Sequence, residues 1–176
     1  FGFEVVDLSV DRYGRVDPDQ LEAAITDRTI VVSIMLANNE VGTIQPVEEI
    51  GRRCRAAGAM FHTDAVQAFG QLPVSVEAAD ATLLTLSGHK IGAPKGIGAL
   101  VVRSRAAVEA IIHGGSQQFG LRPGTENVAG SVALGRAADH EGVCTGLAQH
   151  LGCLALAVNV AVGDHGDRQR RLHCSH

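Results

Sequence analysis

Short apolar segments that predict strands alternate along this chain with segments that predict helices. The run Thr29–Leu36 (TIVVSIML) is rich in β-branched residues and is typical of a strand covered on both faces. The segment Pro46–Ala57 follows, with Val47, Ile50 and Cys54 at helical spacing. Because strands that alternate with helices form parallel sheets, the sequence predicts an α/β domain with a mostly parallel sheet flanked by helices.

Further elements follow the same pattern. Asp17 and Pro18 have the residue types of an N-cap and a first helical position, and they predict a helix that runs to Ala24. We expect further strands at Phe3–Val10, Ala59–Thr63, Ala81–Leu86 and Ile97–Arg103, and further helices at Arg105–Ile111 and Asn127–His140.

The length of 176 residues corresponds to about one domain. We expect residues 1–141 to form part of that domain. Residues 142–176 differ, because their last part is polar and rich in His, Arg and Asp, and we expect an atypical or poorly ordered tail there. The first residue is Phe1 rather than Met, so we expect a processed or partial product.

Composition excludes several functional classes. The net charge of −4 offers no basic surface for nucleic acid. The longest mostly apolar run, Cys153–Val162, is too short to span a membrane. The four cysteines form no CxxC pair, which favours reduced thiols and a cytoplasmic protein. His173, Cys174 and His176 have the chemistry of metal ligands but lack a second pair, so we predict no metal site.

Polar clusters follow three of the expected strands directly. They are Asn38–Asn39, Asp64–Gln67 and Ser87–Lys90. In open α/β sheets, ligands bind beyond the carboxyl ends of the strands. We therefore expect these clusters to converge on one site.

The residues alone leave the chemistry of these clusters open. Lys90 is either a surface lysine in a turn or, with its pKa lowered, an amine that forms a Schiff base. Asp64 and Gln67 share one side of a helical turn, and the acid needs a partner, which could be a protonated pyridine nitrogen, a structural Arg or a helix N-terminus. Asn38 and Asn39 could bind a ligand or form a turn through local hydrogen bonds.

A glycine-rich segment, Gly114–Thr125, could bind an anion through backbone N–H groups or could be a flexible loop. Neither it nor Gly92–Gly98 fits the GxxxxGK[ST] pattern, and no GxGxxG follows a strand. A P-loop NTPase and a dinucleotide-binding Rossmann site are therefore disfavoured.

Four segments, taken in order, resemble one family. They are NNEVGTIQP (Asn38–Pro46), FHTDAVQAFGQLP (Phe61–Pro73), SGHKIGAPKGIGAL (Ser87–Leu100) and GLRPGTENV (Gly120–Val128). Over about residues 1–140 the chain resembles the cysteine desulfurases, which are pyridoxal-phosphate enzymes of the class V aminotransferase group. This resemblance implies the large domain of the fold type I pyridoxal-phosphate transferases, here incomplete.

The resemblance also implies a role for each matched residue. Lys90 would hold pyridoxal 5′-phosphate as a Schiff base and later move the Cα proton of the substrate. Asp64 would pair with the pyridinium nitrogen, which keeps the ring a good electron sink, and Gln67 would bind the phenolic oxygen. Ser87 and His89 would bind the phosphate, Asn39 would contact cofactor and substrate, and Thr125 would reach the phosphate site of the neighbouring subunit in a homodimer.

The implied reaction converts L-cysteine to L-alanine, and a protein thiolate takes the sulfur as a persulfide for sulfur-acceptor proteins in iron–sulfur cluster or thio-cofactor biosynthesis. Selenocysteine lyase or another class V enzyme is the alternative within this chemistry. Cys144, Cys153 and Cys174 lack the surroundings of the family's persulfide cysteine, so none is assigned that role. We therefore expect the isolated chain not to turn over cysteine. A second alternative is an inactive remnant that only binds the cofactor or pairs with a homologue.

Overall fold

The computed structural model describes residues 2–103, 108–140 and 172–173. Its centre is a four-stranded sheet in the order β1-β2-β3-β4. The strands are β1 (Val31–Met35), β2 (Met60–Asp64), β3 (Leu83–Ser87) and β4 (Gly98–Val102). The helices are α1 (Pro18–Ala24), α2 (Val47–Ala56) and α3 (Val128–His140), with short 3-10 helices η1 (Gly88–Lys90) and η3 (Gln118–Gly120). A separate pair consists of β5 (Val108–Glu109) and β6 (Leu172–His173).

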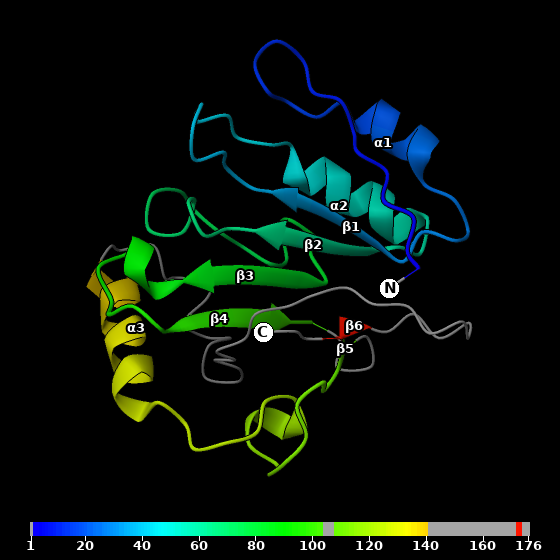
Figure 1. Ribbon diagram of the computed structural model, residues 1–176. Coiled ribbons are helices and arrows are strands. Elements are labelled where there is room, and N and C mark those ends of the chain that lie inside the picture. The colour runs from blue at the N-terminus through cyan, green and yellow to red at the C-terminus, as the bar shows by residue number, and fades with distance from the viewer. Residues whose placement is uncertain (1, 104–107, 141–171, 174–176) are drawn as a thin grey trace.

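The predicted α/β architecture with a mostly parallel sheet is confirmed. Strands β1, β2 and β3 are parallel, and β4 runs antiparallel to β3. Figure 1 shows α1 and α2 beside β1 and β2, with the carboxyl ends of the three parallel strands at one edge of the sheet. None of the helices in the described ranges combines the length and the apolar character needed to cross a membrane.

Helix α1 begins at a side-chain cap, and ion pairs join it to α2. The side chain of Asp17 accepts a hydrogen bond from the backbone N–H of Asp19 at 2.9 Å, as expected of an N-cap, and Pro18 opens α1. On α2, the Arg53 guanidinium forms ion pairs with Asp19 and Glu22 of α1 and with Glu49 one turn earlier on α2. These carboxylates raise the pKa of Arg53 further above its already high usual value. The pairs therefore fix α1 along the outer side of α2.

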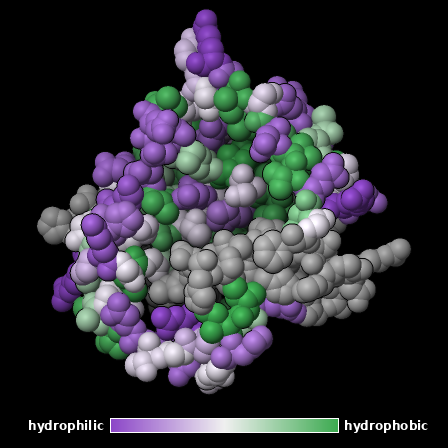
Figure 2. Space-filling view, in the orientation of Figure 1, coloured by the Kyte–Doolittle hydropathy of each residue, from purple (hydrophilic) through white to green (hydrophobic). Residues whose placement is uncertain are grey.

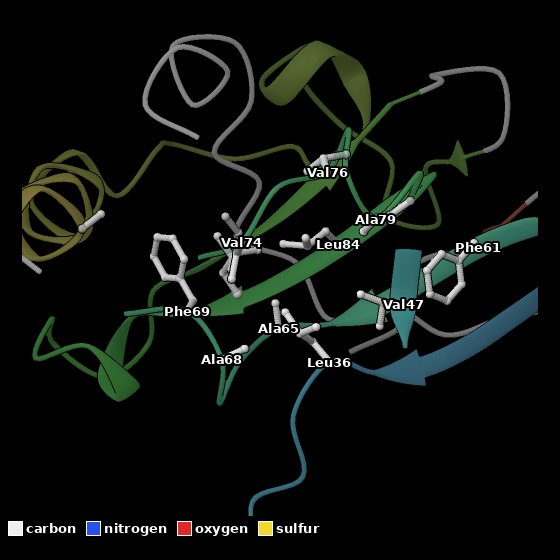
Figure 3. Packing of buried hydrophobic residues seen from close by; sticks show 14 of the residues in the cluster. Leu36, Val47, Phe61, Ala65, Ala68, Phe69, Val74, Val76, Ala79 and Leu84 are labelled. Carbon is white, nitrogen blue, oxygen red and sulfur yellow. The ribbon is translucent and has the colours of Figure 1, made fainter. Parts of the chain in front are cut away.

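The main core lies between α2 and one face of the sheet. Ile50 and Cys54 of α2 have no exposed surface, and Phe61 of β2 and Leu84 of β3 are buried against the same cluster. Figure 3 shows that its side chains come from α2, from the strands and from the segment that links β2 to β3. The apolar spacing along α2 therefore predicted the buried side of that helix correctly.

The opposite face of the sheet changes character along its length. Near the amino ends of the parallel strands it carries a second apolar cluster that includes Met60, Leu83 and Leu100. Nearer the carboxyl ends, strand alternation places His62 and Asp64 on this same face. The polar groups on this sheet face, His62 and Asp64, therefore lie toward the carboxyl ends of the strands, where ligands bind in open α/β sheets.

Figure 2 shows the molecular surface in the orientation of Figure 1, with hydrophilic and hydrophobic residues side by side rather than one continuous apolar patch.

Two of the expected elements are wrong. Residues 3–9 form no strand, and Val10 makes only an isolated bridge with Val16. Val5 and Val6 are 79% and 61% exposed, so the loose alternation of this segment meets no core that would order it as a strand. The expected helix Arg105–Ile111 is also wrong in its described part, because Val108–Glu109 is the strand β5.

The expected boundary after residue 141 and the expected tail lie outside the described residues, apart from β6. There, Leu172–His173 pairs in parallel with β5. The helix expected at Asn127–His140 is confirmed as α3.

Candidate cofactor site

Asp64 is the last residue of β2 and is held in place on two sides. Its backbone carbonyl accepts a hydrogen bond from the N–H of Leu36 at 2.8 Å. Its carboxylate Oδ1 accepts a second one from the N–H of Val66, also at 2.8 Å. The carboxylate is half-buried. These contacts fix an acidic group at the carboxyl end of a central strand.

Gln67 lies on a single helical turn that follows Asp64. The N–H of Phe69 donates to the carbonyl of Ala65 at 2.8 Å, which closes the turn. Ala65 and Ala68 are fully buried and anchor the turn in the core, whereas Asp64 and Gln67 are half-buried. The predicted helical spacing of the acid and the amide is therefore present.

The turn after β3 carries the candidate lysine. Ser87 ends β3, and its Oγ lies 2.7 Å from Nδ1 of His89. Lys90 is the last residue of η1, and both His89 and Lys90 are exposed. A hydroxyl, an imidazole and an amine therefore occupy four consecutive residues at the end of this strand.

Two glycines let the chain return tightly after this turn. A Cβ on Gly88 would lie 2.8 Å from Cγ2 of Ile97, and a Cβ on Gly98 would lie 2.7 Å from the backbone oxygen of Leu86. The N–H of Gly88 donates to the carbonyl of Ile97 at 2.9 Å. Because no side chain fits at these two positions, the sequence SGHKIGAPKGIG can place η1 directly against the start of β4.

The clusters after β2 and β3 lie at the same edge of the sheet. Asp64 is in register with Thr85, and Ser87 follows two residues later on the same face of β3. The loop after β1 begins at this edge too, because β1 is parallel to β2. The structure therefore brings together five of the predicted residues, which are Asp64, Gln67, Ser87, His89 and Lys90.

The two asparagines after β1 have different environments. Oδ1 of Asn38 accepts hydrogen bonds from the N–H groups of Glu40 and Val41 at 2.9 and 3.0 Å. Asn38 thus shapes its own turn, as the turn interpretation expected. Asn39 is exposed at the tip of this turn.

Thr125 lies apart from the strand ends. It is exposed in the segment between η3 and α3, and Figure 1 shows this segment beyond the β4 edge of the sheet. Its backbone carbonyl accepts a hydrogen bond from Arg122 at 3.4 Å. That Thr125 reaches the phosphate site of a neighbouring subunit stays a prediction.

Sequence analysis missed three residues next to this site. On the face that carries Asp64, the ring of His62 lies between the hydroxyls of Ser33 and Thr85. Burial lowers the pKa of His62 below its usual value, and the nearby Asp64 carboxylate partly opposes this effect. The alternation of β2 could have placed His62 beside Asp64, but only the register supplies its partners.

The chain matches the aminotransferase class-V family over residues 1–150. It belongs to this family. Similar curated proteins include the cysteine desulfurase IscS of Methanosarcina thermophila, which is 52% identical over 138 residues that make up 78% of this chain and 34% of the relative. A cysteine desulfurase of Nostoc sp. PCC 7120 is 52% identical over 140 residues, 80% of this chain and 35% of the relative.

Solved structures of class V relatives share the fold. A NifS-like protein superposes with a TM-score of 0.76 at 40% identity and covers 86% of this chain and 40% of its own. A structure of SspA in complex with cysteine gives a TM-score of 0.76 at 37% identity, over 89% of this chain and 50% of the other. The fold is thus part of the large domain of the fold type I enzymes. The chain spans about a third of the length of these curated relatives.

The cofactor of this class V family is pyridoxal 5′-phosphate. The donor set at the strand ends fits its chemistry. Asp64 offers a carboxylate to a basic ring nitrogen, Lys90 offers an amine to an aldehyde, and Ser87 with His89 offers hydrogen-bond donors to a phosphate. Five of the residues that the family resemblance assigned to the cofactor, Asp64, Gln67, Ser87, His89 and Lys90, are therefore of the right types and lie at one edge, whereas Thr125 lies apart from it.

Proposed function

We propose that this chain forms the cofactor-binding part of a pyridoxal-phosphate-dependent cysteine desulfurase. The observation that carries this proposal is that Lys90 on η1 and Asp64 on β2 both lie at the carboxyl edge of one parallel sheet. An exposed lysine in a turn has no functional meaning by itself. A lysine, a fixed carboxylate and a Ser–His pair at one edge match the three reactive parts of a single cofactor.

Each side chain has one task in this proposal. The cofactor supplies an electron sink for the Cα carbanion of an amino acid. Lys90 binds the cofactor through its amine and carries the Cα proton. Asp64, held by the Val66 N–H, orients toward the ring nitrogen and keeps it protonated. Gln67 donates to the phenolic oxygen from the turn that follows Asp64.

The remaining residues bind the ends of the cofactor. The Ser87 hydroxyl and the His89 ring, already 2.7 Å apart, act together on the phosphate. Asn39 contacts the cofactor and the substrate from the loop after β1. Thr125 completes the phosphate site of a second subunit, so the proposal includes a homodimer.

L-Cysteine is the proposed substrate, L-alanine the product, and a sulfur-acceptor protein the partner. The names of the curated relatives support this assignment, and so does the relative whose structure holds cysteine. A cytoplasmic location belongs to the same proposal, supported by the absence of a CxxC pair. Selenocysteine lyase is the other candidate named by the family resemblance, and no contact in the described residues favours it.

The test is covalent capture of the cofactor by the whole chain. Purified protein is mixed with pyridoxal 5′-phosphate, its visible absorbance is recorded, the mixture is reduced with borohydride, and the tagged peptide is identified by mass. We expect the tag on Lys90, and we expect Lys90→Ala to lose both the tag and the visible absorbance band. Lys95 provides the matched control, because it is also exposed and lies five residues away in the same loop region.

The control also defines the contrary result. Lys95→Ala keeps the tag on Lys90 if the site assembles as proposed. Equal tagging of Lys90 and Lys95, or no absorbance band at all, would show that the chain has the ancestry of the family but not a working cofactor site.

A further inference from the structure

A row of hydrogen-bonded side chains crosses the sheet just before the cofactor edge. Nδ1 of His62 lies 2.8 Å from Oγ of Ser33 on β1, and its Nε2 lies 3.1 Å from Oγ1 of Thr85 on β3. Met60 lies two residues before His62, and Leu83 lies two residues before Thr85; both belong to an apolar cluster on this face. A polar side chain on such a face is costly to bury unless its groups are paired, and both ring nitrogens of His62 are paired.

The register connects this row to Asp64. Thr85 is the direct partner of Asp64 in the pairing of β2 and β3, and adjacent strands are about 4.8 Å apart. His62 lies two residues before Asp64 on the same face of β2. Thr85 therefore neighbours Asp64 through the register and His62 through a hydrogen bond.

The hydrogen bonds that join Ser33, His62 and Thr85 can run in two directions, depending on which ring nitrogen of His62 carries the proton. A neutral imidazole has one N–H donor and one acceptor nitrogen, whereas each hydroxyl can donate or accept. If Nε2 of His62 carries the proton, it donates to Thr85, and Ser33 donates to Nδ1. If Nδ1 carries the proton, Thr85 must donate to Nε2, and its O–H then points away from Asp64.

The charge of Asp64 selects between these directions. An ionised carboxylate only accepts hydrogen bonds, so it favours neighbouring dipoles whose positive ends face it. Asp64 is also the charge that acts on His62 among the described residues. The direction with Nε2–H leaves the Thr85 hydroxyl proton free to turn toward Asp64, and the opposite direction does not.

We propose that His62 is a positioning residue for the cofactor site: it donates its Nε2–H to Thr85 and thereby turns the Thr85 hydroxyl toward Asp64. The positive end of this hydroxyl dipole then faces the Asp64 carboxylate and stabilises its charged form, which is the form that binds the ring nitrogen of the cofactor. The part that concerns the cofactor rests on the proposed function, whereas the direction of the row belongs to the chain alone.

The direction can be measured without cofactor. Nitrogen-15 NMR of the histidine-labelled chain distinguishes the two neutral tautomers, and the signals of His62 are assigned by their loss in His62→Gln. We expect the Nε2–H tautomer in the unsubstituted chain, and a shift toward Nδ1–H in Asp64→Asn, where the charge is removed. A dominant Nδ1–H tautomer, or one that is insensitive to Asp64→Asn, overturns the proposal.

Two substitutions then separate positioning from space filling. The amide nitrogen of His62→Gln can occupy the place of Nε2 and donate to Thr85, whereas the amide of His62→Asn reaches only the place of Nδ1, next to Ser33. We expect His62→Asn to bind pyridoxal 5′-phosphate roughly twofold to tenfold more weakly, the range for one hydrogen bond, and His62→Gln to bind like the unsubstituted chain. Urea unfolding of each variant shows whether it is folded.

The outcomes keep the two proposals apart. Equal losses in His62→Gln and His62→Asn would indicate a role in packing alone and would overturn the positioning role. If the unsubstituted chain takes up no cofactor, the proposed function fails, and the tautomer measurement alone then decides the direction of the row.

Discussion

Cys54 shows how burial lowers the reactivity of a cysteine thiol. It lies on the sheet-facing side of α2 and has no exposed surface. Burial raises the pKa of its thiol to about 11. The thiolate is the nucleophilic form of cysteine. Cys54 is therefore a packing residue of the core rather than a candidate for sulfur transfer.

We predict that Cys54 resists alkylation in the folded chain. With a pKa of about 11 instead of 9.0, its thiolate fraction at pH 8 is about a hundredfold lower, and burial slows the reagent further. Iodoacetamide labelling at pH 8 followed by peptide mass analysis measures this directly. The same reaction in concentrated urea is the control and should label Cys54 fully. Native labelling at the rate of the unfolded chain would contradict the buried position.

The individual site residues were predictable from the sequence to different degrees. Asp64 and Ser87 come directly after predicted strands, and Lys90 belongs to the polar cluster that Ser87 begins, so their place at strand ends could be inferred without a structure. The hydrogen-bond partners of His62 could not be inferred in this way, because Ser33 and Thr85 are 29 and 23 residues away in the chain. Only the register of three strands brings these groups together, and no local pattern encodes that register.

At the level of elements, α2 is fixed by a very close approach to the segment that links β2 to β3. A Cβ on Gly51 would lie 1.9 Å from the backbone oxygen of Ala79. The next residue, Asp80, forms ion pairs with Arg55 of α2 and with Arg103 after β4. The helix, the linking segment and the end of β4 are thus locked to one another.

We predict that Gly51→Ala destabilises the fold even though alanine favours helices. The clash with the Ala79 carbonyl should lower the free energy of unfolding by about 1–3 kcal/mol, the usual result of overpacking. Gly135 of α3 is the matched control, because a Cβ there meets nothing within 4 Å. Gly135→Ala should raise the free energy of unfolding by up to about 1 kcal/mol. Urea unfolding of both variants checks the difference, and effects of the same sign would contradict it.

Most elements with a buried side were predicted well, although the segment of the buried Val108 forms the strand β5 instead of the expected helix. Thr29–Leu36 and Pro46–Ala57 were recognised because their apolar spacing matches the core that they face. Phe3–Val10 shows a similar loose alternation, but Val5 and Val6 remain largely exposed. Spacing reports which residues can be buried together. It does not report whether a partner surface is present.

At the level of the whole molecule, the sheet is packed on both faces, and the larger core lies on the α2 face. Ile50 at the centre of that core has no exposed surface, whereas Ile44 is 52% exposed. The same residue type therefore occupies one fully buried and one largely exposed position.

We predict that these two isoleucines differ when each is shortened by one methyl group. Ile50→Val should lower the free energy of unfolding by about 0.5–1.5 kcal/mol, and Ile44→Val should change it by less than about 0.5 kcal/mol. Urea denaturation followed by circular dichroism measures both variants. Equal effects would contradict the assignment of the core to the α2 face of the sheet.

The order of the strands has a consequence for how the protein is made. β1, β2, β3 and β4 lie in the sheet in the same order as in the chain. Each strand that leaves the ribosome therefore finds its partner already synthesised and next in line, and β4 needs only the short connection after η1 to reach β3. Pairing between sequence neighbours closes small loops and favours fast folding. These four strands can thus pair one after another during translation, with the candidate lysine emerging just before β4 is added.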